Sequence, residues 1–324
     1  MSEAIIAEAL RKTYPNDVTA LDGLSLAAER GTIFAVAGPN GAGKSTTVRI
    51  LTTLSRPDAG TAQVAGIDVL AHPDRVRRVI GVVGQKTGAT PEATARENLL
   101  MQGEIYGLRG SALQRRVDEL LDRFQLQEAA GRQTSTYSGG MRRRLDVALG
   151  LVNRPEVLFL DEPTTGLDPE ARSQLWLEIE RLAGEEEMTI LLTTHYLEEA
   201  DRLAGQLAIV DRGRIVAQGT PEALKSELRG DAIEVGLAQP VDERLVLAPL
   251  QSVGGLSEIR VDARTVRARA ENGASAIPGV LNALERQGVQ VAAVTLARPS
   301  LDDVYLRHAG RSYADAADAE MEAA

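Results

Sequence analysis

The sequence GPNGAGKST, residues 38–46, matches the pattern G-x-x-x-x-G-K-[ST] at every fixed position. An apolar run, Ile33–Ala37, precedes it, and a stretch with helical spacing begins near Lys44. We therefore expect a strand, a loop and a helix in succession. Glycines let such a loop wrap around phosphate groups, and the helix N-terminus adds positive potential. A glycine-rich turn before an ordinary helix is the competing interpretation, and the strand–loop–helix setting favours a phosphate-binding loop.

The residue types in this loop assign individual roles. The Lys44 ammonium is expected to contact the β- and γ-phosphates, and the Ser45 hydroxyl to ligate Mg²⁺. The pattern thus predicts a nucleoside triphosphate and Mg²⁺ as the bound species. The residues of the loop expected to bind nucleotide are Gly38, Pro39, Asn40, Gly41, Ala42, Gly43, Lys44, Ser45 and Thr46.

A second apolar run, Val157–Leu160, ends in two adjacent carboxylates. Asp161 is expected to hold the Mg²⁺ shell, and Glu162 to polarise a water for attack on the γ-phosphate. On its own, a strand that ends in Asp-Glu is more often a solvated strand end. The combination with Lys44 favours a hydrolytic site, with Lys44 and Glu162 as catalytic residues.

Composition and charge exclude several classes of function. The 324 residues include 36 Lys and Arg against 46 Asp and Glu, which gives a net charge of −10. Broad nucleic-acid binding needs a basic face, so we expect no nucleic-acid partner. The chain has no cysteine, which excludes disulfides and thiolate chemistry. Neither a secretory signal at the N-terminus nor an apolar run of roughly 18 residues is evident, so any membrane role is expected to need a partner.

The order of apolar and periodic segments predicts an α/β fold. From about Ile5 to Gln218, short apolar runs alternate with helical stretches, which is typical of a mainly parallel sheet. Residues Glu92–Asn153 show helical spacing and no convincing strand, and we interpret them as an inserted helical subdomain. Further strands are expected at Thr189–Thr193 and Leu207–Val210.

The character of the sequence changes after residue 220, and we place a domain boundary near residue 230. We expect a nucleotide-binding domain at residues 1–230, an α+β accessory domain at residues 231–310 and a disordered tail at residues 311–324. The accessory domain has the βαββαβ order of a ferredoxin-like unit. Its expected elements, after a short helix at Pro221–Leu228, are strand Ala232–Leu237, helix Asp242–Leu250, strands Leu256–Val261 and Thr265–Ala270, helix Ser275–Gln287 and strand Val289–Leu296.

A third motif lies between the two phosphate-site motifs. Residues 137–141, YSGGM, precede the helical run Arg142–Val152, and a serine with two glycines at a helix N-terminus makes another anion site. With this motif the chain resembles the nucleotide-binding subunits of ABC transporters over about residues 5–220. The resemblance implies a P-loop NTPase core of the ABC ATPase type. It further implies that Ser138, Gly139 and Gly140 close over ATP bound by a second copy, as a homodimer. Met141 departs from the commonest signature, LSGGQ, and cannot donate the hydrogen bond of a glutamine.

The remaining motifs follow the order of the same family. Gln85 resembles the glutamine that ligates Mg²⁺ and senses the membrane subunit, so the expected metal ligands are Ser45, Gln85 and Asp161. Asp168 ends a segment that resembles the loop crossing the dimer interface. His195 resembles the switch histidine that contacts the γ-phosphate and is the third expected catalytic residue. Tyr14 occupies the place of the adenine-stacking aromatic, with an ordinary turn tyrosine as the competing interpretation.

Two further segments narrow the resemblance. YSGGMRRRLD (137–146) and the block Pro299–Leu306 are similar to the ATPase subunits of daunorubicin/doxorubicin-resistance drug exporters. An amphipathic helix that packs the last domain onto the first is the competing interpretation of Leu301–Leu306. This resemblance implies an ATPase of an ABC-2 type exporter, acting with a separate polytopic permease at the cytoplasmic face of the cell membrane. The alternatives are a soluble ABC ATPase in translation or DNA maintenance, a binding module without hydrolysis, and a transporter of another cargo such as lipid or polysaccharide.

Overall fold

This computed structural model describes residues 2–228, 230–297 and 299–313, whose contacts separate two compact units. The first unit holds residues 2–221 with 308–313, and the second holds Glu222–Arg307. The expected disordered tail falls, from residue 314 onward, outside the described residues. No described helix combines the length and the apolar character that crossing a membrane requires.

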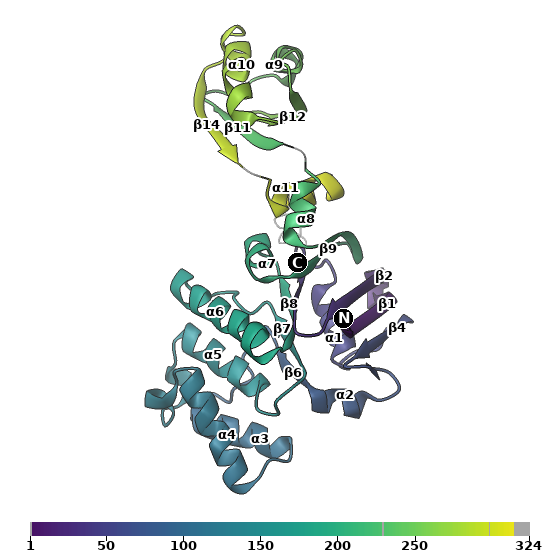
Figure 1. Cartoon of the computed structure of the whole chain (residues 1–324), viewed down its shortest axis with the longest axis vertical. Coiled ribbons are helices and arrows are strands. Elements are labelled where there is room, and N and C mark those ends of the chain that lie inside the picture. Colours follow the sequence, from purple (N-terminus) through teal and green to yellow (C-terminus); the bar gives the residue numbers. More distant parts are fainter. Residues whose placement is uncertain (1, 229, 298, 314–324) are drawn as a thin grey trace. The chain divides into compact units, whose positions relative to one another are not determined.

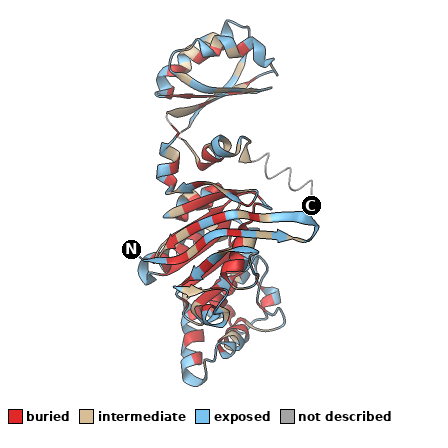
Figure 2. Ribbon diagram, turned by 90° about the vertical axis from the view of Figure 1, so that its right-hand side faces the viewer, coloured by how far each residue is buried: buried red, intermediate tan, exposed pale blue. Residues whose placement is uncertain are grey.

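A six-stranded sheet forms the centre of the first unit (Figure 1). Its order is β10-β9-β3-β8-β7-β6, with parallel pairing throughout except for the antiparallel β9–β10 hairpin. Every residue of β3 and β8 is buried, as expected for strands covered on both faces (Figure 2). The predicted α/β fold is confirmed, with strands β3 (Ile33–Ala37), β6 (Ile80–Val83), β7 (Val157–Asp161), β8 (Thr189–Thr194), β9 (Gln206–Asp211) and β10 (Arg214–Gly219).

A second, antiparallel sheet in the same unit has no counterpart in the sequence prediction. Its order is β2-β1-β4-β5, formed by β1 (Glu3–Tyr14), β2 (Val18–Glu29), β4 (Ala59–Val64) and β5 (Ile67–Asp68). Register shifts interrupt β1, and Ala9 has a positive φ of 48°. These bulges break the alternation of apolar and polar residues by which a strand is identified in sequence.

Helices cover the central sheet, and three of them form the expected helical insertion. Figure 1 shows α3 (Ala95–Ile105), α4 (Gly110–Arg123) and α5 (Gly139–Gly150) grouped on the β6 side of the sheet. Residues 92–153, all described, contain no strand beyond one isolated bridge between Thr94 and Gln133. The other helices of this unit are α1 (Lys44–Leu51), α2 (Pro73–Val79), α6 (Pro169–Glu186) and α7 (Leu197–Leu203).

The second unit has the predicted ferredoxin-like order. Its antiparallel sheet, β12-β13-β11-β14, is made of β11 (Asp231–Leu237), β12 (Leu256–Asp262), β13 (Thr265–Ala270) and β14 (Val291–Ala297). Helices α9 (Glu243–Gln251) and α10 (Gly273–Glu285) pack on it around a core that includes Val235 and Leu284. Helix α10 begins two residues before the expected Ser275, because the Asn272 side chain accepts a hydrogen bond from the Ser275 amide.

Two short helices complete this part of the chain. Helix α8 (Pro221–Ser226) is shorter than the expected Pro221–Leu228. Helix α11 (Leu301–Ala309) begins after Ser300, whose amide and hydroxyl both donate to Asp303. Asp303 also lies 3.3 Å from the buried Arg269 of β13, which ties the start of α11 to the sheet.

Candidate active site

The loop between β3 and α1 has the tight backbone that the sequence predicts. Gly43 has φ = 109°, and a Cβ atom there would lie 2.4 Å from the Ala20 carbonyl oxygen, so only glycine fits. Lys44 is 4% exposed. Its ammonium donates 2.8 Å hydrogen bonds to the carbonyl oxygens of Gly38 and Pro39. The lysine therefore lies folded back over the loop whose amides are predicted to bind phosphate.

The end of β7 places Asp161 beside this loop. The Ser45 hydroxyl donates to Asp161 Oδ1 over 3.2 Å, and the Thr193 hydroxyl donates to the same oxygen over 2.6 Å. These contacts follow from the sheet order, because β7 and β3 are both neighbours of β8. The structure thus brings together Ser45 and Asp161, two of the three expected metal ligands. Thr193 joins them, and no spacing pattern distinguishes it in the sequence from any other threonine at a strand end.

Glu162 is the residue around which the predicted catalytic groups meet. Its side chain is buried, with 9% exposed. Glu162 is the first residue after β7 and has a positive φ of 47°. Its carboxylate oxygens lie 3.4 Å from Lys44 Nζ and 3.2 Å from His195 Nδ1. Thr165 also donates to it over 3.3 Å. His195 Nδ1 has no well-aligned hydrogen-bond partner among the described residues, so it approaches Glu162 closely without a hydrogen bond.

The electrostatic surroundings keep this carboxylate ionised. Burial alone would raise the pKa of Glu162, but the nearby His195 and Lys44 side chains outweigh burial and hold the pKa below its ordinary value. A general base must be deprotonated to accept a proton, so Glu162 meets this requirement at neutral pH.

Folding stability should therefore depend on this carboxylate in a defined direction. A carboxyl with a lowered folded pKa stabilises the fold above its unfolded pKa of about 4.3, and this contribution is lost as the pH falls through the folded value. We expect Glu162→Gln to lower the free energy of unfolding more at about pH 7 than at about pH 3.5. Urea unfolding at both pH values measures the difference, with Glu198→Gln, an exposed carboxylate on α7, as the control. An equal loss at both values would contradict the lowered pKa.

Gln85 and Tyr14 lie at the ends of strands that border the site. Gln85 is exposed two residues after β6, whose neighbour in the sheet is β7. Tyr14 is the last residue of β1, with the Lys12 ammonium 5.7 Å from its ring centroid. Hydrogen bonding to Thr46 is the largest cause of a lowered pKa for the Tyr14 hydroxyl, which sets this ring beside the start of α1.

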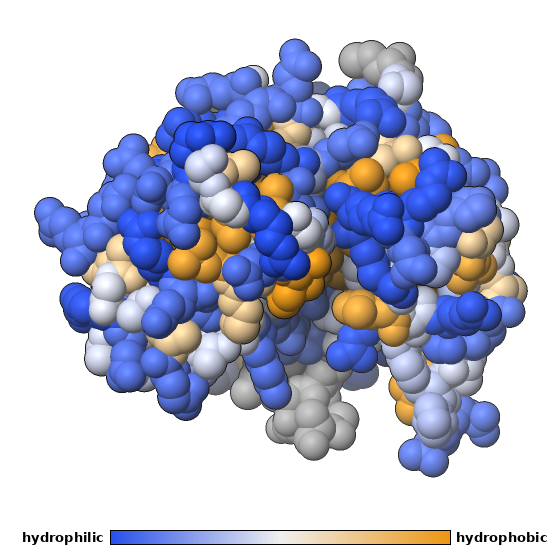
Figure 3. Space-filling view, turned by 90° about the horizontal axis from the view of Figure 1, so that it is seen from below, coloured by the Kyte–Doolittle hydropathy of each residue, from blue (hydrophilic) through white to orange (hydrophobic). Residues whose placement is uncertain are grey.

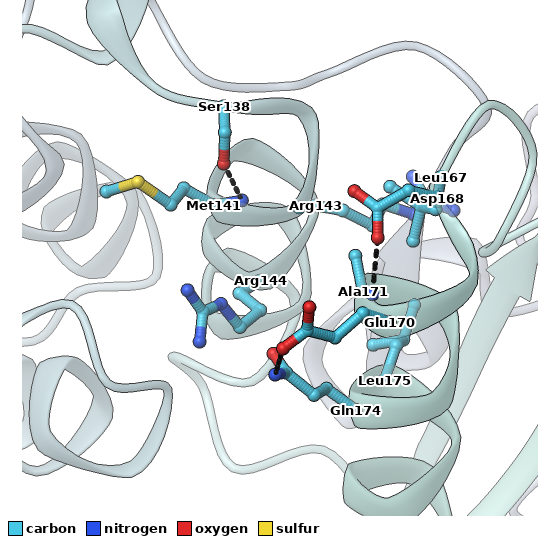
Figure 4. Close-up of a pocket in the computed structure, with 11 residues that line it drawn as sticks. Ser138, Met141, Arg143, Arg144, Leu167, Asp168, Glu170, Ala171, Gln174 and Leu175 are labelled. Carbon is cyan, nitrogen blue, oxygen red and sulfur yellow. Dashed lines mark hydrogen bonds between the residues drawn. The ribbon is translucent and has the colours of Figure 1, made fainter.

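The serine–glycine–glycine motif lies in a different pocket of the chain (Figure 4). Ser138 is the N-cap of α5, and its hydroxyl accepts a 3.2 Å hydrogen bond from the Met141 amide. Asp168 caps α6 in the same way, accepting from the Ala171 amide over 2.8 Å. Both residues, with Gly140, line a pocket of about 160 Å³. None of the phosphate-loop residues lines it, so one chain does not bring the two motifs together.

The chain is similar to known proteins over most of its length. The family model described as ABC transporter matches residues 21–165, and that of the ATP-binding protein DrrA1-3-like, C-terminal domain, matches residues 219–309. The chain is 45% identical to the daunorubicin resistance ATP-binding protein DrrA3 of Streptomyces coeruleorubidus, over 95% of this chain and 96% of that protein. It is 40% identical to a Nod factor export ATP-binding protein I of Ralstonia nicotianae, over 95% of this chain and 94% of that protein.

A solved structure shows the same fold. The structure of a dimeric bacterial ABC transporter cassette superposes with a TM-score of 0.61 at 26% identity, over 67% of this chain and 98% of that one. The matched share agrees with a cassette fold in the first unit and an additional small domain after it.

Proposed function

The chain belongs to the ATP-binding proteins of ABC transporters, and from this premise we propose that it drives export of a drug-like compound through a separate membrane subunit. It is an ATPase subunit of an ABC exporter. The observation that carries the catalytic part is the position of the Glu162 carboxylate within 3.4 Å of both Lys44 and His195. The proposed base, phosphate-binding cation and γ-phosphate contact thereby lie together around one buried carboxylate.

In this proposal the residues act mainly by positioning and by stabilising charge. The amides of residues 38–46 hold the phosphates, and Lys44 exchanges its bonds to Gly38 and Pro39 for bonds to the β- and γ-phosphates. Glu162 accepts the proton of the attacking water, and His195 contacts the γ-phosphate. Tyr14 stacks on the base.

The oxygen-rich edge of the site fits Mg²⁺. Ser45 and Asp161 supply a hydroxyl and a carboxylate that already lie 3.2 Å apart, and Gln85 would add an amide oxygen. Among the described residues, no cluster of three or more His, Cys, Asp or Glu could hold a metal without help. The hydroxyl and carboxylate of Ser45 and Asp161 suit Mg²⁺, which is usually bound by one or two carboxylates together with substrate phosphates. When bound, it would neutralise charge that develops on the phosphate oxygens.

A second copy of the chain would complete the site. Ser138 and Gly140 face a pocket that no residue of the phosphate loop lines, so they are available to nucleotide held by another molecule. The similar cassette of known structure is a dimer. We propose that two copies place the α5 N-terminus of each over the nucleotide of the other, with Asp168 at the interface.

The proposed cargo comes from the names of similar proteins. A relative at 45% identity is named for daunorubicin resistance, and another at 40% for Nod factor export. These names differ in cargo while both proteins are ATP-binding subunits of similar length. We therefore assign cargo recognition to the membrane subunit, with a hydrophobic drug as the first candidate and a Nod-factor-like compound as the second. The alternative of a soluble ABC ATPase in translation or DNA maintenance is not favoured.

The membrane subunit would dock on the helical insertion, with this chain at the cytoplasmic face. Met101 and Ile105 are exposed one turn apart on α3, and Ile105 is 73% exposed. Figure 3 views the end of the molecule that carries α3 and α4, where apolar side chains gather in patches within a mostly hydrophilic surface. An exposed apolar patch rimmed by polar residues is a typical protein interaction site.

Ile105→Glu tests this docking surface. We expect it to lower ATP-dependent transport at least about tenfold, because a charge would be buried without a partner in the interface. ATP hydrolysis by the isolated subunit should stay within about twofold of wild type, since Ile105 is exposed on a helix that contains none of the assigned site residues. Drug uptake into inverted vesicles that contain both subunits measures the first quantity. Leu177→Glu on α6, which is 58% exposed, is the matched control. Full transport by Ile105→Glu would exclude this surface.

A further inference from the structure

Helix α5 carries a buried arginine whose bonds lead to the candidate active site. Arg143 is 7% exposed. Its guanidinium donates to three carbonyl oxygens on two segments: 2.7 Å to Gly84 after β6, and 2.6 Å to Pro163 and 3.3 Å to Asp161 at the end of β7. Gly84 immediately precedes Gln85, while the other two carbonyls flank Glu162. One side chain thus holds the backbone of Asp161 and the backbone next to Gln85 and Glu162, three residues to which we assign roles in ATP hydrolysis.

A buried carboxylate one turn further along α5 holds the other end of the same loop. Asp146 Oδ1 accepts hydrogen bonds from the Thr87 hydroxyl over 2.8 Å and from the Gly88 amide over 2.9 Å. Only Gln85 and Lys86 lie between the points that Arg143 and Asp146 hold. The exposed side chain of Gln85 therefore extends from a backbone that is fixed on both sides by one helix.

The chemistry of these contacts shows why the two residue types are needed. The fork of a guanidinium has five donors in a fixed plane, so it can bind three carbonyl groups at once, which a lysine ammonium on a flexible stem cannot do. Bonds to charged groups are the strong ones, and a buried donor or acceptor that loses its partner is costly. Burial lowers the pKa of Arg143 and raises that of Asp146, as expected for two charges removed from water.

We propose that Arg143 and Asp146 are positioning residues that set Gln85 and Asp161 at the distance from each other that nucleotide-bound Mg²⁺ requires. The inference rests on the roles proposed above for Gln85 and Asp161. Because Ser138 caps the first turn of the same helix, a movement of α5 is transmitted to Gln85 through these two side chains.

Hydrogen–deuterium exchange of the nucleotide-free protein tests the proposal directly. Arg143→Lys and Asp146→Ala should raise the exchange rate of amides in residues 84–89 by about tenfold or more. Local opening of this segment would cost less free energy, because the charge-assisted hydrogen bonds that hold it would be missing. Asp146→Asn keeps an acceptor oxygen and should restore most of the protection. The matched control is Arg116→Lys, which alters a similarly buried arginine that donates to the carbonyl oxygens of Leu151 and Val152. Its effect should be confined to the helical insertion.

A binding measurement separates positioning from general loss of structure. Arg143→Lys should bind ATP without Mg²⁺ within about twofold of wild type, while the Mg²⁺ concentration for half-maximal binding rises about tenfold. Unchanged exchange at residues 84–89, an equal rise throughout the core, or an unchanged Mg²⁺ requirement would each overturn the proposal. A different result would show that the proposed roles of Gln85 and Glu162 in ATP hydrolysis are wrong. In that case Gln85→Ala and Glu162→Gln would leave ATP turnover intact.

Discussion

Glu162→Gln is expected to lower the rate of ATP hydrolysis by about 10²- to 10⁴-fold, the range typical for loss of a general base. The glutamine has nearly the same shape but cannot accept the proton of the attacking water. ATP binding should be preserved within a few-fold, because the phosphates are held by the loop amides and Lys44. Removal of the negative charge beside Lys44, at 3.4 Å, should if anything free the ammonium for phosphate.

Phosphate release and equilibrium binding of ATP measure the two halves of this prediction. Glu198→Gln, the same substitution at an exposed site on α7, should leave both quantities unchanged. Because ATP is bound but not hydrolysed, Glu162→Gln should also accumulate as an ATP-bound dimer in size-exclusion chromatography. Turnover within about twofold of wild type would show that another group activates the water, and the role of Glu162 would have to be abandoned.

The parts of this site that follow from the sequence are those fixed by local chemistry. Residues 38–46 need glycines for a tight turn and a lysine for phosphate, so spacing alone identifies the loop. Asp161 and Glu162 are recognisable because a buried strand ends at them. The βαββαβ order of the second unit can be predicted because apolar residues alternate along strands such as β11 and turn residues separate the elements.

The parts that do not follow are those set by tertiary contacts. Thr193 binds Asp161 only because β8 lies between β3 and β7, an order that no local pattern states. Arg143 stands among three consecutive arginines, and sequence cannot tell which of them is buried. The bulges of β1 likewise hide a twelve-residue strand from any period-two search.

Mixing two inactive variants should restore ATP hydrolysis if the site is shared between copies. Lys44→Ala removes the phosphate-binding cation, and Ser138→Trp blocks the pocket at the α5 N-terminus. We expect each variant alone to fall to about 1% of wild-type turnover or less, since removal of one charge-stabilising group commonly costs 10²- to 10³-fold. Every site in either homodimer lacks one of the two required parts.

The mixture distinguishes action between copies from action within one copy. In a mixed dimer, the intact loop of the Ser138→Trp copy meets the intact α5 N-terminus of the Lys44→Ala copy, which makes one complete site. Random pairing gives mixed dimers in half of the population, so about a quarter of wild-type turnover should return. If both motifs served the same nucleotide within one chain, no complete site could form in any pairing. Turnover would then stay at the level of the separate variants, because the pocket at Ser138 and the loop at Lys44 would each remain defective wherever the other was intact.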